Sequence, residues 1–236
     1  MPKRFFFFMV ALWMTAAPAA RAADPADVLL VLAADVSRSI TAEKFDLQRK
    51  GYAAAMLDPQ VLDALAAGPK RSIAVAFVEW SGDGSQQLVV DWTLIRSSAD
   101  AEAFGTRILQ APRAFGNRTA IGSALTFAET VLARCPFTGD RKVIDVSGDG
   151  INNSGPDVRA ARDAVLAHGV SAINGLVILS QDTGPGYMRE HTNPPGGLAG
   201  YYRENVIGGV GSFVLVANGF ESFGRSLVAK LLQEIS

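Results

Sequence analysis

The sequence predicts a three-layer, doubly wound α/β fold, with a mostly parallel sheet that carries one antiparallel edge strand. Apolar runs of strand length alternate with helical patterns along most of the chain, which is typical of parallel sheets covered by helices on both faces. The first run, 28–34, shows little alternation of polar and apolar residues, as expected for a strand buried on both faces. One connection, 81–84, is too short for a crossover helix and predicts the antiparallel pair.

The first 22 residues have the pattern of a secretory signal peptide. Lys3 and Arg4 precede an apolar stretch, and residues 20–22 (Ala-Arg-Ala) form a small-residue cleavage signal. The apolar stretch is too short for a spanning helix. We therefore expect cleavage after residue 22, a periplasmic or secreted protein without a transmembrane anchor in its mature chain, and one domain over residues 23–236.

The charge of the mature chain argues against a nucleic-acid partner. Residues 23–236 hold 19 Lys and Arg against 23 Asp and Glu, a formal net charge of −4, and no basic stripe is present. Their length suits a single α/β domain with a substantial core.

The elements follow in order from these patterns. The first helix is predicted over 41–57 with Thr41 as its N-cap. Further helices are predicted over 99–110, from 119, over 156–168 and from 220 onward, and further strands over 73–80, 87–94, 143–147, 170–179 and 213–217. The remaining segment, 181–212, is rich in Gly and predicts a long loop, either a partner-reading surface or a loop packed around Tyr201 and Tyr202.

The most informative polar residues directly follow the first strand. Asp35, Ser37 and Ser39 occupy alternate positions, so on an extended chain their side chains point the same way and can converge. Three small oxygen groups from one turn suit a hard cation such as Mg²⁺.

Two later segments add oxygen groups of the same kind. Asp149 follows the strand 143–147, and Thr119 stands at a helix start, where its hydroxyl can either cap the backbone or turn toward a cation. Ligands of such sheets bind where the carboxyl ends of the strands meet, so we expect all three segments at one edge. Asp145 interrupts the same strand, and both a structural hydrogen bond and a supporting role behind the site are open for it.

The order Asp35-x-Ser37-x-Ser39, then Thr119, then Asp149 resembles the metal-ion-dependent adhesion site of von Willebrand factor A domains. The order of strands and helices fits that superfamily over nearly all of the mature chain. Three shorter segments are similar to an uncharacterised bacterial branch of it, a domain of unknown function: 77–80, 143–150 and 206–209.

The resemblance implies a role for each residue. Ser37 and Ser39 would bind the cation directly, Thr119 would bind it directly or through water, and Asp35 and Asp149 would hold coordinated waters. The implied ion is Mg²⁺, with Mn²⁺ or Ca²⁺ as alternatives. Hydroxyl ligands leave such an ion poorly neutralised, so the expected partner is a protein that offers an Asp, Glu or C-terminal carboxylate to a non-enzymatic, adhesion-type module.

Two other functions are weighed against this one. The loop 148–153 also resembles the last motif of haloacid-dehalogenase-type phosphatases, with Asp35 as the nucleophile, but Ser37 stands where those enzymes need an acidic general acid. A structural domain with an unused site is the other. The sequence supports hydrolysis by a Ser/His/Asp triad least, since only His168 and His191 are available and no Gly-x-Ser-x-Gly motif occurs.

Overall fold

The computed structural model of the chain describes residues 23–113, 116–179 and 186–235. The predicted signal peptide, residues 1–22, lies outside the described residues. Within the described part, every helix is too short or too polar to cross a membrane.

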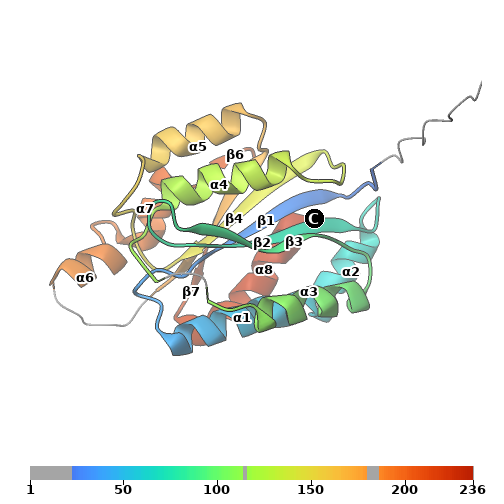
Figure 1. Cartoon of the computed structure of the whole chain (residues 1–236), viewed down its shortest axis with the longest axis horizontal. Helices are drawn as coiled ribbons and strands as arrows, with labels where there is room; N and C mark the ends of the chain where they lie inside the picture. The colour runs from blue at the N-terminus through green and yellow to red at the C-terminus, as the bar shows by residue number, and fades with distance from the viewer. Residues whose placement is uncertain (1–22, 114–115, 180–185, 236) are drawn as a thin grey trace, which may run out of the picture.

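A seven-stranded sheet forms the middle layer (Figure 1). Its strands are β1 (Val28–Asp35), β2 (Ile73–Trp80), β3 (Gln86–Ile95), β4 (Arg141–Gly148), β5 (Ala172–Ile178), β6 (Gly208–Gly209) and β7 (Val214–Ala217). The order is β3-β2-β1-β4-β5-β6, and β7 also pairs with β5. The pairs β1–β2, β1–β4, β4–β5 and β5–β7 are parallel, while β2–β3 is the predicted antiparallel hairpin. The predicted fold class is confirmed, and the two-residue β6 adds a short antiparallel pairing with β5.

Helices cover both faces of the sheet (Figure 1). One layer contains α1 (Ala42–Met56), α2 (Pro59–Ala67), α3 (Ser98–Gln110) and α8 (Phe223–Ile235), which follows the short η1 (Phe220–Ser222). The opposite layer contains α4 (Ile121–Ala133), α5 (Val158–Ala167) and α7 (Gly197–Asn205). The short α6 (Gly186–Thr192) precedes α7.

The strand β1 explains why the first apolar run lacks alternation. Leu30 and Leu32 belong to the core beneath α1 and α8, whereas Leu29 and Val31 belong to the core beneath α4. All eight residues of β1 are buried. A central strand with both faces covered needs apolar side chains at every position.

Two predicted helix starts are shifted and one cap is confirmed. The hydroxyl of Thr41 accepts a hydrogen bond from the Lys44 amide at 3.2 Å, as its predicted N-cap role requires. The helix predicted from 119 begins at Ile121. The helix predicted from 156 begins at Val158, because Asp157 is its N-cap and accepts from the Ala160 amide at 2.9 Å.

The prediction of a long loop over 181–212 is wrong for most of its length. Residues 181–185 lie outside the described residues, but α6, α7 and β6 occupy much of the remainder. Leu198 and Tyr202 of α7 and its C-cap residue Val206 are spaced four apart and fully or almost fully buried, so they form one apolar side of this segment. Tyr201 is half-buried. Of the two predicted alternatives, packing of the segment around Tyr201 and Tyr202 agrees better with the structure than a partner-reading surface does.

Candidate metal site

The three predicted segments meet between β1, β4 and the start of α4. Asp35 is the last residue of β1, and Asp149 directly follows β4, its neighbour in the sheet. The chain continues from β1 to β2 on one side, while β4 lies on the other. Such a reversal of strand order is where doubly wound sheets open a crevice for ligands.

Hydrogen bonds join four of the five predicted residues. The Ser37 amide donates to Asp35 Oδ1 at 2.7 Å, which folds the turn that follows β1. The hydroxyl oxygens of Ser37 and Ser39 lie 3.1 Å apart. Ser39 Oγ donates to Asp149 Oδ1 at 2.6 Å, so the loops after β1 and β4 are directly connected.

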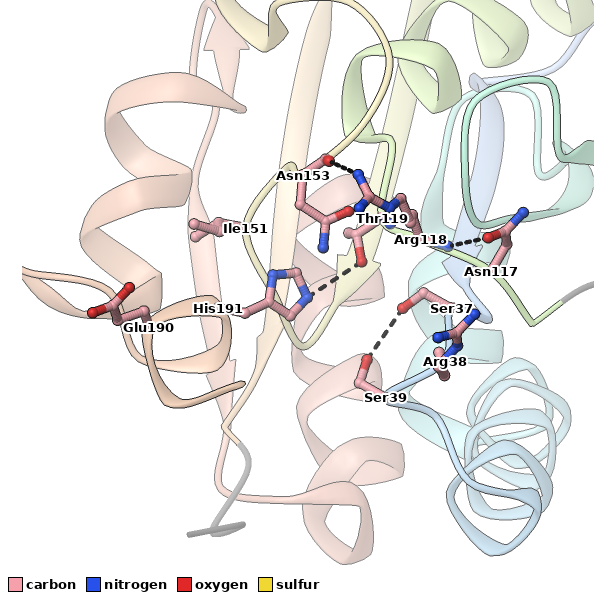
Figure 2. A pocket seen from close by; sticks show the side chains of 10 residues that line it. All are labelled: Ser37, Arg38, Ser39, Asn117, Arg118, Thr119, Ile151, Asn153, Glu190 and His191. Atoms are coloured by element: carbon pink, nitrogen blue, oxygen red, sulfur yellow. Dashed lines mark hydrogen bonds between the residues drawn. The ribbon is translucent and has the colours of Figure 1, made fainter. Parts of the chain in front are cut away.

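The hydroxyl of Thr119 does not cap α4. Asn152 Oδ1 accepts from the Ile121 amide at 2.7 Å, and Asn153 Oδ1 accepts from the Thr119 amide at 2.9 Å. These two side chains from the loop after β4 satisfy backbone donors at the start of α4, where the N-cap residue Ala120 makes no side-chain cap bond. Thr119 Oγ1 therefore turns into the pocket (Figure 2).

A pocket of about 430 Å³ opens over these hydroxyl groups (Figure 2). Its lining residues come from the loops after β1 and β4, from the segment before α4 and from α6: Ser37, Arg38, Ser39, Asn117, Arg118, Thr119, Ile151, Asn153, Glu190 and His191. Of the five predicted site residues, Ser37, Ser39 and Thr119 line the pocket, while Asp35 and Asp149 are fully buried close to it.

A positive charge nearby would stabilise the ionised forms of the two buried carboxyl groups. Burial, and then the neighbouring charge of Asp149, raise the pKa of Asp35 to about 8. Asp35 Oδ2 accepts no hydrogen bond from the described residues. A divalent ion among the hydroxyl groups would answer both features, since it favours the ionised carboxylates and its waters can donate to them.

The spacing of the hydroxyl groups suits a shared ion. Adjacent ligands of an octahedral Mg²⁺ lie about 3.0 Å apart when each is about 2.1 Å from the metal. The separation of 3.1 Å between Ser37 Oγ and Ser39 Oγ is close to that value. Within the described ranges, no group of three His, Cys, Asp or Glu side chains is placed to hold a metal, so an ion here would depend on hydroxyl oxygens.

An arginine that the sequence did not indicate holds the loop after β1. Arg113 Nη2 donates to the backbone carbonyls of Ile40 at 2.7 Å, Val36 at 2.9 Å and Ser37 at 3.2 Å. Its guanidinium lies over the ring of Phe45 in α1, 5.0 Å from the centroid. Arg113 thus fixes the backbone that carries Ser37 and Ser39.

His191 is a further residue of the pocket that the sequence did not indicate. Its Nε2 lies 3.3 Å from Thr119 Oγ1, and the two side chains point toward each other in Figure 2. Burial lowers the pKa of His191, so its imidazole is neutral near pH 7. Sequence spacing gave no signal, because His191 lies on α6, a helix that the periodicity did not predict.

One family model matches residues 25–236 of the chain, and its description is "Protein of unknown function (DUF1194)". No curated protein sequence is detectably similar to the chain.

Several solved structures share the fold. The pilus adhesin SpaC of Lactobacillus rhamnosus GG is 11% identical with a TM-score of 0.57, over 91% of this chain and 31% of the adhesin. Proximal thread matrix protein 1 of the mussel byssus, with a zinc-occupied MIDAS motif, is 16% identical with a TM-score of 0.57, over 89% of this chain and 48% of that protein. A von Willebrand factor type A protein of Catenulispora acidiphila is 14% identical with a TM-score of 0.53, over 88% of this chain and 42% of its own.

These similarities establish a von Willebrand A-type fold, which the sequence predicted. The chain spans between about a third and a half of the length of each of these three proteins.

Proposed function

The chain belongs to the DUF1194 family of proteins of unknown function, and we propose that it is an exported protein-binding module without enzymatic activity. It recognises a carboxylate of a partner protein through a divalent cation held by Ser37, Ser39 and Thr119. Export follows from the signal-like pattern of residues 1–22.

The observation that carries this proposal is that the hydroxyl groups line the pocket while the two carboxyl groups lie behind them. Ser37, Ser39 and Thr119 line the pocket, although Ser37 and Thr119 are each only 1% exposed, whereas Asp35 and Asp149 are fully buried and do not line it. An ion in contact with the hydroxyl groups faces the pocket, where a partner can reach it. Neutral ligands leave much of its charge uncompensated, which favours an anionic sixth ligand over further water.

The rim of the pocket has the charge that such a partner requires. Arg38 and Arg118 are exposed and line the pocket, and among the described residues they outnumber its one acidic lining residue, Glu190. Two guanidinium groups beside a cation attract an acidic segment and favour carboxylate recognition. The fold shared with a pilus adhesin, and with a matrix protein that holds zinc in the corresponding type of motif, supports adhesion of this kind.

The three hydroxyl ligands by themselves suit Mg²⁺, with Mn²⁺ or Ca²⁺ as alternatives. All three proposed direct ligands are oxygen atoms, and hard cations prefer oxygen. Asp35 and Asp149 would accept hydrogen bonds from coordinated waters and balance the charge of the ion.

Phosphatase chemistry is less well supported by the same residues. A nucleophilic Asp35 would have to reach its substrate, yet its side chain is fully buried, does not line the pocket and accepts from the Ser37 amide. Ser37 also occupies the position of the general acid, and a serine hydroxyl is too weak an acid for that role.

Capture from an envelope extract tests the proposal directly. Immobilised protein comprising residues 23–236 is incubated with the extract in Mg²⁺ and in chelator, beside Ser39→Ala and the control Ser98→Ala. Ser98 is an exposed hydroxyl on α3 and does not line the pocket. The expected result is a partner retained by the wild type and Ser98→Ala only when Mg²⁺ is present, and released by an excess of free glutamate. A partner retained equally in chelator, or by Ser39→Ala, would contradict the proposal.

A further inference from the structure

His191 brings a nitrogen atom to a site whose other ligands are oxygen atoms. Resting on the cation site proposed above, we infer that His191 Nε2 is an additional ligand of the ion. The site then selects a cation that accepts nitrogen, such as Zn²⁺, over Mg²⁺.

The position of the imidazole is set by its contacts with the loop after β4. The Ile151 amide donates to the His191 carbonyl at 3.0 Å, which ties α6 to that loop. A Cβ atom added to Gly150 would lie 2.1 Å from His191 Nε2, so the ring packs against the residue that follows Asp149. Only glycine leaves room for the imidazole there.

The ring is directed at the proposed ligands. Nε2 lies 3.3 Å from Thr119 Oγ1. Figure 2 shows this pair and the Ser37–Ser39 pair facing the same space, and all four residues line one pocket. Neighbouring ligands of a zinc ion lie about 3.0–3.3 Å apart when each is about 2.0–2.1 Å from the metal and the ion has four to six ligands, so this separation suits joint ligation with room for a partner carboxylate.

The chemical consequence is a change in metal preference. Mg²⁺ has little affinity for imidazole, whereas Zn²⁺ binds nitrogen and oxygen ligands together and binds a mixed site more tightly than Mn²⁺ does. The imidazole nitrogen therefore adds to the affinity for Zn²⁺ and contributes little to the affinity for Mg²⁺. The Ser and Thr hydroxyl groups serve both ions.

The chain offers a matched control, because it has only two histidines. His168 is exposed at the end of α5, and its Nδ1 lies 2.7 Å from Glu129 Oε1, so it does not belong to the pocket. The variants to compare are His191→Gln, His168→Gln and Ser39→Ala, all in untagged protein comprising residues 23–236. Glutamine keeps a polar group beside Thr119 but removes the ring nitrogen.

Isothermal titration of metal-free protein with Zn²⁺ and with Mg²⁺ measures the preference. We expect His191→Gln to lower Zn²⁺ affinity at least about tenfold while Mg²⁺ affinity changes little, and His168→Gln to change neither. Ser39→Ala should weaken both ions. Loss of both ions equally in His191→Gln, or of neither, would overturn the role of His191. Wild-type affinities in Ser39→Ala would instead overturn the proposed function.

A second measurement uses the wild type and therefore does not depend on the folding of a His191 variant. Long-range ¹H–¹⁵N correlation spectra of the wild type record both imidazoles as Zn²⁺ is added. The expected result is a large shift of His191 Nε2 with His168 unchanged. A spectrum in which saturating Zn²⁺ leaves the His191 nitrogens unmoved would overturn the inference.

Discussion

Two pairs of fully buried acidic residues lie in different parts of the same fold, one in the core and one at the edge of the sheet, and their neighbours differ. In the core, Asp145 of β4 and Glu234 of α8 share Lys230, whose Nζ lies 2.8 Å from Asp145 Oδ1 and also pairs with Glu234. Asn174 Nδ2 donates to Glu234 Oε1 at 3.0 Å. Asp145, Glu234 and Lys230 are fully buried and Asn174 almost so, so the chain supplies this acidic pair with its own cation.

At the edge of the sheet, Asp35 and Asp149 are as deeply buried but contact groups of another kind. The Ser37 amide donates to Asp35, the Ser39 hydroxyl donates to Asp149, and a pocket opens beside them. Under the proposed function a cation taken from solvent would bind in this pocket beside the pair, whereas the core pair already has Lys230 as its cation. β4 therefore carries an acid that is paired within the core in its middle, and just beyond its end the acid that our proposed function assigns to a cation site.

Removing the internal cation should have the largest effect. Lys230→Met leaves Asp145 and Glu234 buried without a counter-charge, and breaking a buried pair in this way costs about 3–5 kcal/mol of unfolding free energy. Urea unfolding at pH 8 measures the loss. The control is Lys50→Met, whose exposed pair with Asp46 should contribute no more than about 0.5 kcal/mol. Equal losses in the two variants would remove the distinction between a core ion pair and a surface pair.

An added cation should stabilise the folded protein through the proposed cation site of Ser37, Ser39 and Thr119, called the edge site below, and not through the core pair. An ion that binds the folded form alone adds about 2.7 kcal/mol at a hundredfold excess over its Kd. Ser39→Ala should lose most of this increment, and Lys230→Met should keep it because its change lies in the core. Thermal unfolding of metal-free protein with added ion or chelator provides the measurement. Identical curves for the wild type in both conditions would argue that the edge pair needs no ion.

Removing the charge of Asp149, which lies behind the hydroxyl groups, should have the next largest effect, a loss of cation affinity. Asp149→Asn keeps an acceptor for Ser39 but removes a charge, and loss of such a group lowers metal affinity about 10–100-fold. Far-UV circular dichroism should remain that of the wild type, and cation titration should show the weaker binding. An unfolded variant would make Asp149 a structural acid like Asp145, and unchanged affinity would place it outside the site.

The core pair should impose a pH dependence on stability. Two acids share one lysine, and burial first of all raises the pKa of Asp145 to about 7, well above 3.8. Between pH 4 and 7 the folded protein thus holds a proton that the unfolded chain has released, so stability falls as pH rises, by up to about 1.4 kcal/mol per pH unit. The difference between wild type and Asp145→Asn across that window isolates the effect. A difference that is constant from pH 4 to 8 would contradict it.

The same contrast explains which features could be predicted from the sequence. The continuous apolar composition of runs such as 28–34 and 73–80 is enough to indicate buried strands. Asp35, Ser37 and Ser39 are close enough in the chain for their convergence to follow from strand geometry. The proximity of Asp149 followed from the rule that parallel strands present their carboxyl ends together. Local periodicity and one rule of topology therefore sufficed for the fold and for the arrangement of these residues.

Groups whose role depends on distant contacts could not be predicted in this way. Asp145 was identified as an anomaly, but its partner Lys230 lies 85 positions later on another element. Arg113 acts on backbone carbonyls, which leave no pattern in side-chain types. His191 depends on α6, a helix of only seven residues whose place against Gly150 comes from tertiary packing.

The smallest predicted effect concerns how Thr119 becomes available to the edge site. Asn152 Oδ1 accepts from the Ile121 amide and so satisfies the start of α4. Loss of such a cap in Asn152→Ala should cost about 1 kcal/mol of unfolding free energy. Thr119→Ala should cost little stability, because its hydroxyl caps nothing, yet it should weaken cation binding. Urea unfolding and cation titration of both variants provide the test. If Thr119→Ala lost the stability and Asn152→Ala did not, the threonine would be the cap, and the edge site would have two hydroxyl ligands rather than three.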